Sequence, residues 1–134
     1  MSEQILDMSA KKKAKGVGSR KLSASEVASA FIERIEEVNP VINAICTLSD
    51  TILEEAAAID ERLASGGKPR PLEGVPFLIK DILQTKGVRT TFGSLLLEND
   101  VPDEDTISVE RLKAAGGILS VSYTHLTLPT ILRV

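Results

Sequence analysis

A lysine and an aspartate, Lys80 and Asp81, directly follow a short apolar run at residues 75–79. The run is too short for a helix and too apolar for an exposed loop, so it predicts a buried strand. Because side chains alternate along a strand, Lys80 should point to the same face as Leu78. The sequence thus brings an amine to the end of an apolar strand.

Two interpretations of Lys80 follow from this position. An ammonium group is costly to bury, and a lysine that gives up its proton can act as a general base. If both faces of the strand are covered, Lys80 is therefore a candidate catalytic base. The other interpretation is that Lys80 only marks the point where the strand reaches water.

Composition narrows the class of protein. With 134 residues, 43% hydrophobic and 26% charged, the chain is long enough for one ordinary globular domain. Nucleic-acid binding is not expected, because aromatic residues are only 3% and the net charge is −3. A single cysteine and a single histidine predict no disulfide, no metal site and no cofactor. Without a span or leader pattern, we expect a cytoplasmic protein that does not enter a membrane.

The first helix with clear start signals should begin at Leu22-Ser23, where Ser23 has capping-box spacing with Glu26. It should stop at Asn39-Pro40, because the residue before a proline disfavours helix. Its inward stripe is Val27, Phe31, Ile35 and Val38.

The segments around this helix are harder to assign. Residues 1–21 are basic and interrupted by glycines, and we expect a flexible segment. The connector at residues 41–48 is apolar and of uncertain type. Cys46 within it is expected to be a small buried side chain, since no base for a nucleophilic cysteine can be identified.

A second helix is predicted from about Thr51 to Ser65, with Thr51 and Glu54 as a capping pair and Gly66-Gly67 as its end. The residues expected to pack inwards are Ile52, Ala56, Ile59 and Leu63.

A third helix should begin near Asp105 or Thr106 and end at Gly116-Gly117, with a strand at Ile118-Leu119 after it. Residues 98–105 are acidic but lack calcium-ligand spacing, and they predict a solvated loop. The order of these elements predicts an α/β fold with a strand–helix–strand crossover.

Several segments together resemble the amidase signature family. They are residues 25–44, Pro71 to Pro76 with Lys80-Asp81, the small-residue loop at 90–94, and residues 102–119. The resemblance implies the N-terminal part of the amidase signature fold, a truncated mixed sheet flanked by helices. It further implies carbon–nitrogen bond hydrolysis of a small carboxamide by a Ser–cis-Ser–Lys triad whose lysine matches Lys80.

Both serines of that triad belong to a downstream Gly/Ser-rich signature that this chain does not contain. Ser94 matches the small-residue loop and is not expected to be the nucleophile. After Ser120 the resemblance stops, and residues 121–130 look like a translated sequencing-library adapter. We therefore expect a non-native tail at 121–134 and an amidase portion at 22–120. Neither Tyr123 nor His125 should enter any mechanism.

The first functional hypothesis is thus an amidase-type hydrolase fragment, inactive alone because it lacks the nucleophile. A rival is the A subunit of an amidotransferase acting on misacylated tRNA, which would have partner subunits. A non-enzymatic α/β interaction domain is the third alternative. The fragment should also leave the strands at 75–79 and 118–119 with open edges, which predicts poor solubility.

Overall fold

The structure, a computed structural model, describes residues 2–123 and the side chains of residues 3–120. The helices are α1 (Ser2–Asp7), α2 (Ala10–Gly18), α3 (Ala24–Ile42), α4 (Ile52–Ala64) and α5 (Ile107–Ala114), with a short 3-10 helix, η1 (Leu95–Leu97). The strands are β1 (Ile45–Leu48), β2 (Pro76–Lys80) and β3 (Ile118–Tyr123). No helix within residues 2–123 combines the length and the hydropathy needed to cross a bilayer.

The strands form one mixed sheet in the order β1-β3-β2. β3 pairs antiparallel with β1 and parallel with β2, and α5 forms the connection from β2 to β3. This confirms the predicted α/β class, the mixed sheet and the strand–helix–strand crossover. β3 is the central strand, but β1 pairs only with its residues 121–123. Among the described strands, Ile118 and Leu119 pair with β2 alone, so the expected open edge at 118–119 is present on the side that faces away from β2. Within the described chain, β1 and β2 are the outer strands.

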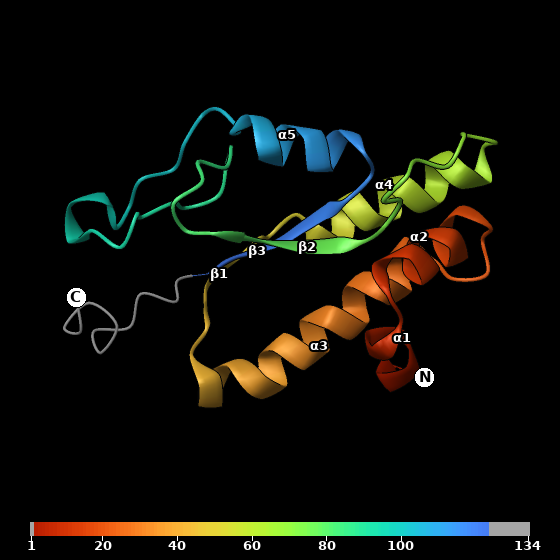
Figure 1. Ribbon diagram of the computed structural model, residues 1–134, viewed down its shortest axis with the longest axis horizontal. Helices are drawn as coiled ribbons and strands as arrows, with labels where there is room; N and C mark the ends of the chain where they lie inside the picture. The colour runs from red at the N-terminus through yellow and green to blue at the C-terminus, as the bar shows by residue number, and fades with distance from the viewer. Residues whose placement is uncertain (1, 124–134) are drawn as a thin grey trace.

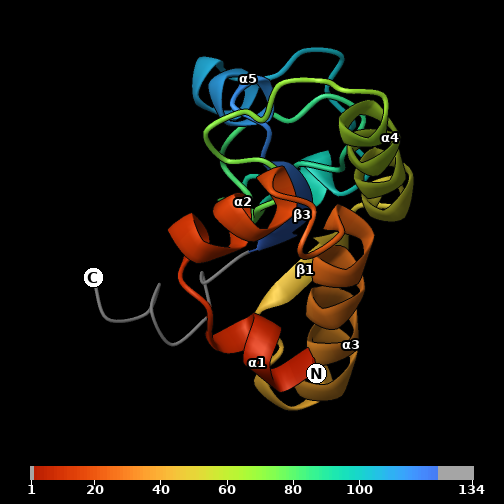
Figure 2. The same cartoon turned by 90° about the vertical axis from the view of Figure 1, so that its right-hand side faces the viewer.

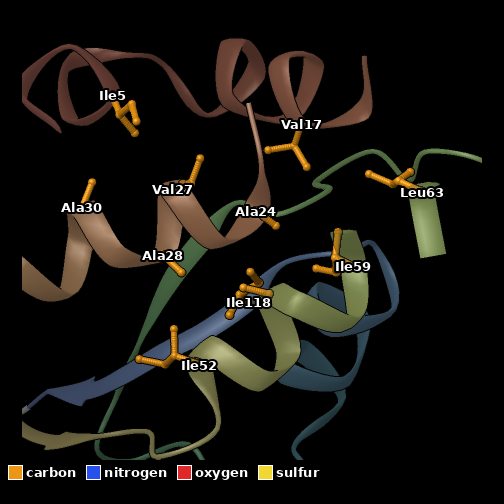
Figure 3. Close-up of a cluster of buried hydrophobic side chains, with 11 residues drawn as sticks. Ile5, Val17, Ala24, Val27, Ala28, Ala30, Ile52, Ile59, Leu63 and Ile118 are labelled. Carbon is orange, nitrogen blue, oxygen red and sulfur yellow. The ribbon is translucent and has the colours of Figure 1, made fainter. Parts of the chain in front are cut away.

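Helices cover both faces of the sheet, with α5 on one side and α1 to α3 on the other (Figure 1; Figure 2 shows the layers from the side). Ile118 and Leu119 are adjacent in β3 and therefore point to opposite faces. Ile118 joins a core built from α1 to α4, part of which is drawn in Figure 3. Leu119 joins a smaller core beneath α5 with Ile79, Val88 and Val109. Both residues are at most 2% exposed, which makes β3 the common wall of the two cores.

Two carboxylates hold the start of α3. The Ser23 hydroxyl accepts the Glu26 N–H at 2.9 Å and the Glu26 carboxylate accepts the Ser23 N–H at 2.8 Å, which confirms the predicted capping box. Asp60 of α4 adds a second cap, accepting the N–H of Ala24 at 2.7 Å and of Ser25 at 3.0 Å. These bonds also tie α3 to α4.

The predicted end of α3 at Asn39-Pro40 is wrong, because the helix continues to Ile42 with Pro40 inside it. A proline in the last turn removes only one N–H, and other bonds support this turn. Asn43 adopts a left-handed φ of 46° and donates its N–H to the Asn39 carbonyl at 2.7 Å. The Asn39 side chain exchanges two hydrogen bonds with the Ile45 backbone, which fixes the start of β1.

The N-terminal segment also differs from its prediction. Residues 1–21 were expected to be flexible, but α1 and α2 form there and pack on α3. Ile5, Ala14 and Val17 are at most 9% exposed and supply the apolar face of this pair. The glycines that suggested a loose chain instead allow close packing, since a Cβ on Gly16 would lie 2.8 Å from Leu22.

Lys13 is the one charged side chain of α2 that turns inwards, and it is 5% exposed. Its ammonium donates to the carbonyls of Leu6 and Met8, at the C-terminal end of α1, and lies 5.1 Å from the centre of the Phe31 ring. Burial lowers the pKa of Lys13, and the nearby Asp7 carboxylate opposes part of that effect. The lysine thus joins α1, α2 and α3.

The inward stripe of α4 is confirmed, since Ile52, Ala56, Ile59 and Leu63 are all buried. The predicted capping pair is wrong. Thr51 makes no side-chain cap bond, and its hydroxyl donates to the Glu55 carboxylate at 2.9 Å. The predicted end of this helix at Gly66-Gly67 is confirmed, because Gly66 has the left-handed φ, 87°, that is typical of a residue just after a helix.

Candidate functional site

Lys80 is the last residue of β2 and pairs in register with Tyr123 of β3. One face of β2 is covered, since Ile79 is 5% exposed and lies in the core beneath α5. The helices on the other face of the sheet do not extend over this end of β2, because Leu78, which shares the face of Lys80, is 48% exposed. Lys80 is half-buried, so this chain alone does not enclose the amine on both sides.

An irregularity in β3 precedes this end of the sheet. Phe77 pairs with Leu119 but Leu78 pairs with Val121, so Ser120 is an extra residue in the parallel ladder. Its hydroxyl is buried and has no hydrogen-bond partner among the described groups. Bulges of this kind change the direction of the residues that follow, here the last residues of β2 and β3.

Asp81 is 0% exposed and ties a distant loop to the end of β2. Its carboxylate accepts the Thr91 N–H on Oδ1 at 2.7 Å and the Thr91 hydroxyl on Oδ2. Its backbone carbonyl accepts the Phe92 N–H at 2.9 Å. The loop of residues 90–94 is therefore held directly beside Lys80.

The chain turns sharply after Lys80, whose carbonyl accepts the N–H of Ile82 at 2.7 Å and of Leu83 at 3.0 Å. Among the described side chains, none forms a hydrogen bond or ion pair with the Lys80 ammonium. No serine hydroxyl of residues 3–120 is thus placed to pass a proton to Lys80. The site as described contains a candidate base without a nucleophile.

The 90–94 loop has an unusual backbone. Phe92 and Gly93 have φ values of 54° and 70°, and the left-handed region is disfavoured for a phenylalanine. Thr90 anchors the loop to a second segment by donating its N–H to the Asp100 carbonyl at 3.0 Å. Ser94 is the N-cap of η1, and its hydroxyl accepts the Leu96 N–H at 3.3 Å. Ser94 therefore has a structural contact in the loop.

A buried carboxylate holds the turn that leads into β2. Glu73 is 0% exposed and pairs with Arg62 of α4 and with Arg70, the latter at 2.9 Å. It also accepts the Arg70 N–H at 2.7 Å. Burial on its own would raise the pKa of Glu73, but the hydrogen bonds from Arg70 and Arg62 outweigh it and hold the pKa below its ordinary value. Glu73 is thus a charged clamp between α4 and β2.

The exposure of Cys46 differs from its prediction. It was expected to be buried, but it is exposed, because β1 is an outer strand. Its carbonyl accepts a hydrogen bond from Arg89 at 3.1 Å, next to a cleft of about 610 Å³. Neither Lys80 nor Asp81 lines this cleft, which lies between β1, the start of α4 and the Lys86–Arg89 segment.

Two remaining expectations concern a metal site and the non-native tail at residues 121–134. Within the described residues, no group of three or more His, Cys, Asp or Glu side chains is placed to hold a metal ion. β3 continues through residues 121–123, so the backbone shows no break at Ser120, where the resemblance was expected to stop. His125 and the rest of the expected tail lie outside the described residues.

The roles of Asp81 and Glu73 were not predicted. Each lies in a motif that the sequence singles out, but their partners are distant or not apparent from spacing. Thr91 is ten residues from Asp81, and Arg62 is eleven residues from Glu73. The sequence offered one indication of these roles. Each acidic residue lies beside an apolar strand, where a buried carboxylate needs a hydrogen-bond or ion-pair partner.

Comparison with known proteins identifies the family. The model of the Amidase family matches residues 26–127. The A subunit of the glutamyl-tRNA(Gln) amidotransferase of Bdellovibrio bacteriovorus is 47% identical over 100 residues, which cover 75% of this chain and 20% of that protein. The acylamidase of Rhodococcus erythropolis is 39% identical over 120 residues, covering 88% of this chain and 25% of that protein. The chain therefore spans about a fifth to a quarter of these relatives.

A solved structure agrees on the fold. The native peptide amidase of Stenotrophomonas maltophilia superposes with a TM-score of 0.81 at 28% identity, over 87% of this chain and 24% of that one. The predicted resemblance to amidase signature enzymes is thus confirmed for both sequence and fold. The chain belongs to the amidase family.

Proposed function

We propose that this chain is the lysine-bearing part of a site that hydrolyses the carbon–nitrogen bond of a small carboxamide. Lys80 is the general base, and the two serines of a Ser–cis-Ser–Lys triad come from sequence beyond this chain. The position of Lys80 at the end of β2, beside the 90–94 loop, is the observation that carries the proposal. The family match at residues 26–127 supports it.

The chemistry suits a lysine at this position. A serine hydroxyl becomes a competent nucleophile when a neighbouring base takes its proton, and a neutral amine can do this. Serine–lysine pairs are a variant of the serine–histidine arrangement. The open face of β2 around Leu78 leaves room for the covering segment that would bring the serines and exclude water.

An isolated chain of 134 residues should accordingly not turn over simple amides. Its expected inactivity follows from the missing nucleophile, since a base without one forms no acyl-enzyme. Turnover of an amide by the purified chain at a rate above the buffer control would contradict this part of the proposal. A cytoplasmic location, expected from composition, belongs to the same proposal.

The A subunit of a tRNA-dependent amidotransferase is a second candidate. It is favoured by the names of several relatives, including one 43% identical over 118 residues from Carboxydothermus hydrogenoformans. Such a protein would deliver ammonia to its partners in a complex. Reading the gene beyond this chain, and looking for genes of those partners beside it, separates this candidate from a free-standing amidase.

A chimaera tests the role of Lys80 directly. Residues 26–120 of this chain would replace the matching stretch of the Rhodococcus erythropolis acylamidase, a relative 39% identical over 120 residues. The chimaera should hydrolyse amides, and its Lys80→Met variant should lose about 10² to 10⁴ in kcat, the usual contribution of a general base.

Lys86→Met, at an exposed lysine six residues away, is the matched control and should leave kcat unchanged. Folding of each variant is checked by circular dichroism and thermal melting. If Lys80→Met keeps the activity of Lys86→Met, Lys80 is not the base and the non-enzymatic interaction domain becomes the better hypothesis.

A further inference from the structure

The feature that the proposed mechanism does not use is the buried carboxylate next to the candidate base. Asp81 is 0% exposed although it lies at the end of a strand, where an aspartate would ordinarily reach water. Burying a carboxylate is costly unless hydrogen bonds compensate for it. Compensation comes from a loop ten residues away, because both oxygens of Asp81 accept hydrogen bonds from Thr91.

That loop would not keep its conformation without support. Phe92 is held at a φ of 54°, a conformation that costs a non-glycine residue free energy and relaxes when its restraints are lost. The N–H of Phe92 and the N–H of Thr91 both donate to Asp81, one to the carbonyl and one to the carboxylate. Asp81 therefore restrains the loop at two successive residues.

The same bonds restrain Lys80. On its N-terminal side, the lysine is fixed by strand pairing with β3, and on its C-terminal side by the peptide plane of Asp81. The direction of a Cα–Cβ bond follows from the backbone on both sides of a residue. Pairing alone would leave the last residue of an outer strand free to fray, as strand ends do.

We propose that Asp81 is a positioning residue for Lys80: it clamps the 90–94 loop to the end of β2 and thereby fixes the direction of the lysine side chain. This inference rests on the proposed role of Lys80 as the base. Asp81 itself touches no reacting atom in this scheme. Its contribution is to hold the amine in the geometry that proton transfer requires.

The geometry favours a carboxylate at this position. The Thr91 N–H and the Thr91 hydroxyl each donate to a different carboxylate oxygen. Asparagine has one acceptor oxygen and would face the hydroxyl with an amide NH2 group. The charged, two-acceptor clamp would be lost in Asp81→Asn, while the size of the side chain stays the same.

Four variants of this chain test the inference. Asp81→Asn and Thr91→Val each remove the carboxylate–hydroxyl bond, Thr91→Ser keeps it, and Asp103→Asn removes an exposed carboxylate of the acidic loop as a charge control. The first readout is amide hydrogen exchange at residues 91 and 92. The second is the rate of Lys80 acetylation by a water-soluble acetyl ester, measured by mass spectrometry relative to Lys86.

Asp81→Asn and Thr91→Val should raise exchange at residues 91 and 92 about tenfold, which is the effect expected for losing a charge-assisted hydrogen bond. Both should also raise the Lys80-to-Lys86 acetylation ratio at least about threefold, because the freed lysine becomes more accessible. Thr91→Ser and Asp103→Asn should match the unmodified chain in both measurements.

Two outcomes in folded variants would overturn the inference. Faster exchange with an unchanged acetylation ratio would mean that Asp81 stabilises the loop without positioning Lys80. Unchanged exchange and an unchanged acetylation ratio would mean that the bonds between Asp81 and Thr91 do not restrain the loop. If Asp81→Asn does not fold, Thr91→Val and Thr91→Ser decide the question. Since these readouts need no serine and no turnover, their failure is distinct from a failure of the chimaera that tests Lys80 as the base.

Discussion

Replacing Glu73 by glutamine would remove the charge from a carboxylate that is 0% exposed and bonded to two arginines. Breaking a buried ion pair by removing one partner costs about 3–5 kcal/mol. The side chains of Arg62 and Arg70 are 36% and 37% exposed, so water can partly solvate them in the variant. We therefore expect the lower end, a loss of about 3 kcal/mol in the free energy of unfolding.

Urea denaturation followed by circular dichroism measures this loss, and thermal melting should show a drop of about 10 °C for a domain of this size. The matched control is Glu37→Gln, which breaks a pair with Arg34 whose partners are 69% and 53% exposed. Such a surface pair contributes less than about 1 kcal/mol. A Glu73→Gln variant no less stable than Glu37→Gln would refute the clamp.

The pH dependence gives a second check on the same residue. The folded-state pKa of Glu73 is lower than the ordinary value of 4.5, so the unfolded chain binds its proton first as the pH falls. The stabilisation is therefore complete above pH 4.5 and is lost as the pH falls through the lowered pKa. The difference in stability between the unmodified chain and Glu73→Gln should narrow below that pH, and a constant difference would contradict the assignment.

Two further variants probe other contacts by the same denaturation assay. Asp60→Ala removes the carboxylate that accepts hydrogen bonds from two backbone N–H groups and from the Ser25 hydroxyl at the start of α3. It should lower the free energy of unfolding by about 2 kcal/mol. A loss below about 0.5 kcal/mol would mean that the Ser23 cap alone is enough to hold the start of this helix. Gly74→Ala places a Cβ 3.0 Å from Val17 at a φ of 68° and should cost about 2–4 kcal/mol. Gly66→Ala, with a φ of 87° and open space, is its control and should cost only about 1 kcal/mol; equal losses would show that contact with Val17 contributes nothing.

Patterns among neighbouring residues were sufficient to locate the main helices and strands. The Ser23–Glu26 spacing located the start of α3 because a capping box involves neighbouring residues only. The apolar run before Lys80 located β2 to within one residue, and the glycine pair at 116–117 correctly marked the end of α5. The order of these elements predicted the strand–helix–strand crossover that joins the parallel strands β2 and β3.

Contacts between distant residues could not be predicted in the same way. The cap that Asp60 provides to α3 joins residues about 35 apart and leaves no periodic pattern. The burial of Lys13 depends on α1 and α3 arriving on either side of it. The exposure of Cys46 follows from the strand order, which is a property of the assembled sheet and not of the apolar connector.

In the candidate site, too, the sequence predicted some features, and others are evident only from the structure. The family resemblance assigned Lys80 a role, but the open face around Leu78 is visible only in three dimensions. The Thr91 that bonds to Asp81 is followed by the left-handed turn at Phe92, and a phenylalanine gives no signal for such a turn.

The central position of β3 has a consequence for synthesis on the ribosome. The core of α1 to α4 is completed by Ile118, which follows β1 by roughly 70 residues, or about 4–14 seconds of translation at common rates. During that interval β1 has no described strand partner, and the apolar faces of α3 and α4 lack the wall on which they later pack. The nascent chain should therefore be a substrate for ribosome-associated chaperones until the residues of β3 leave the exit tunnel.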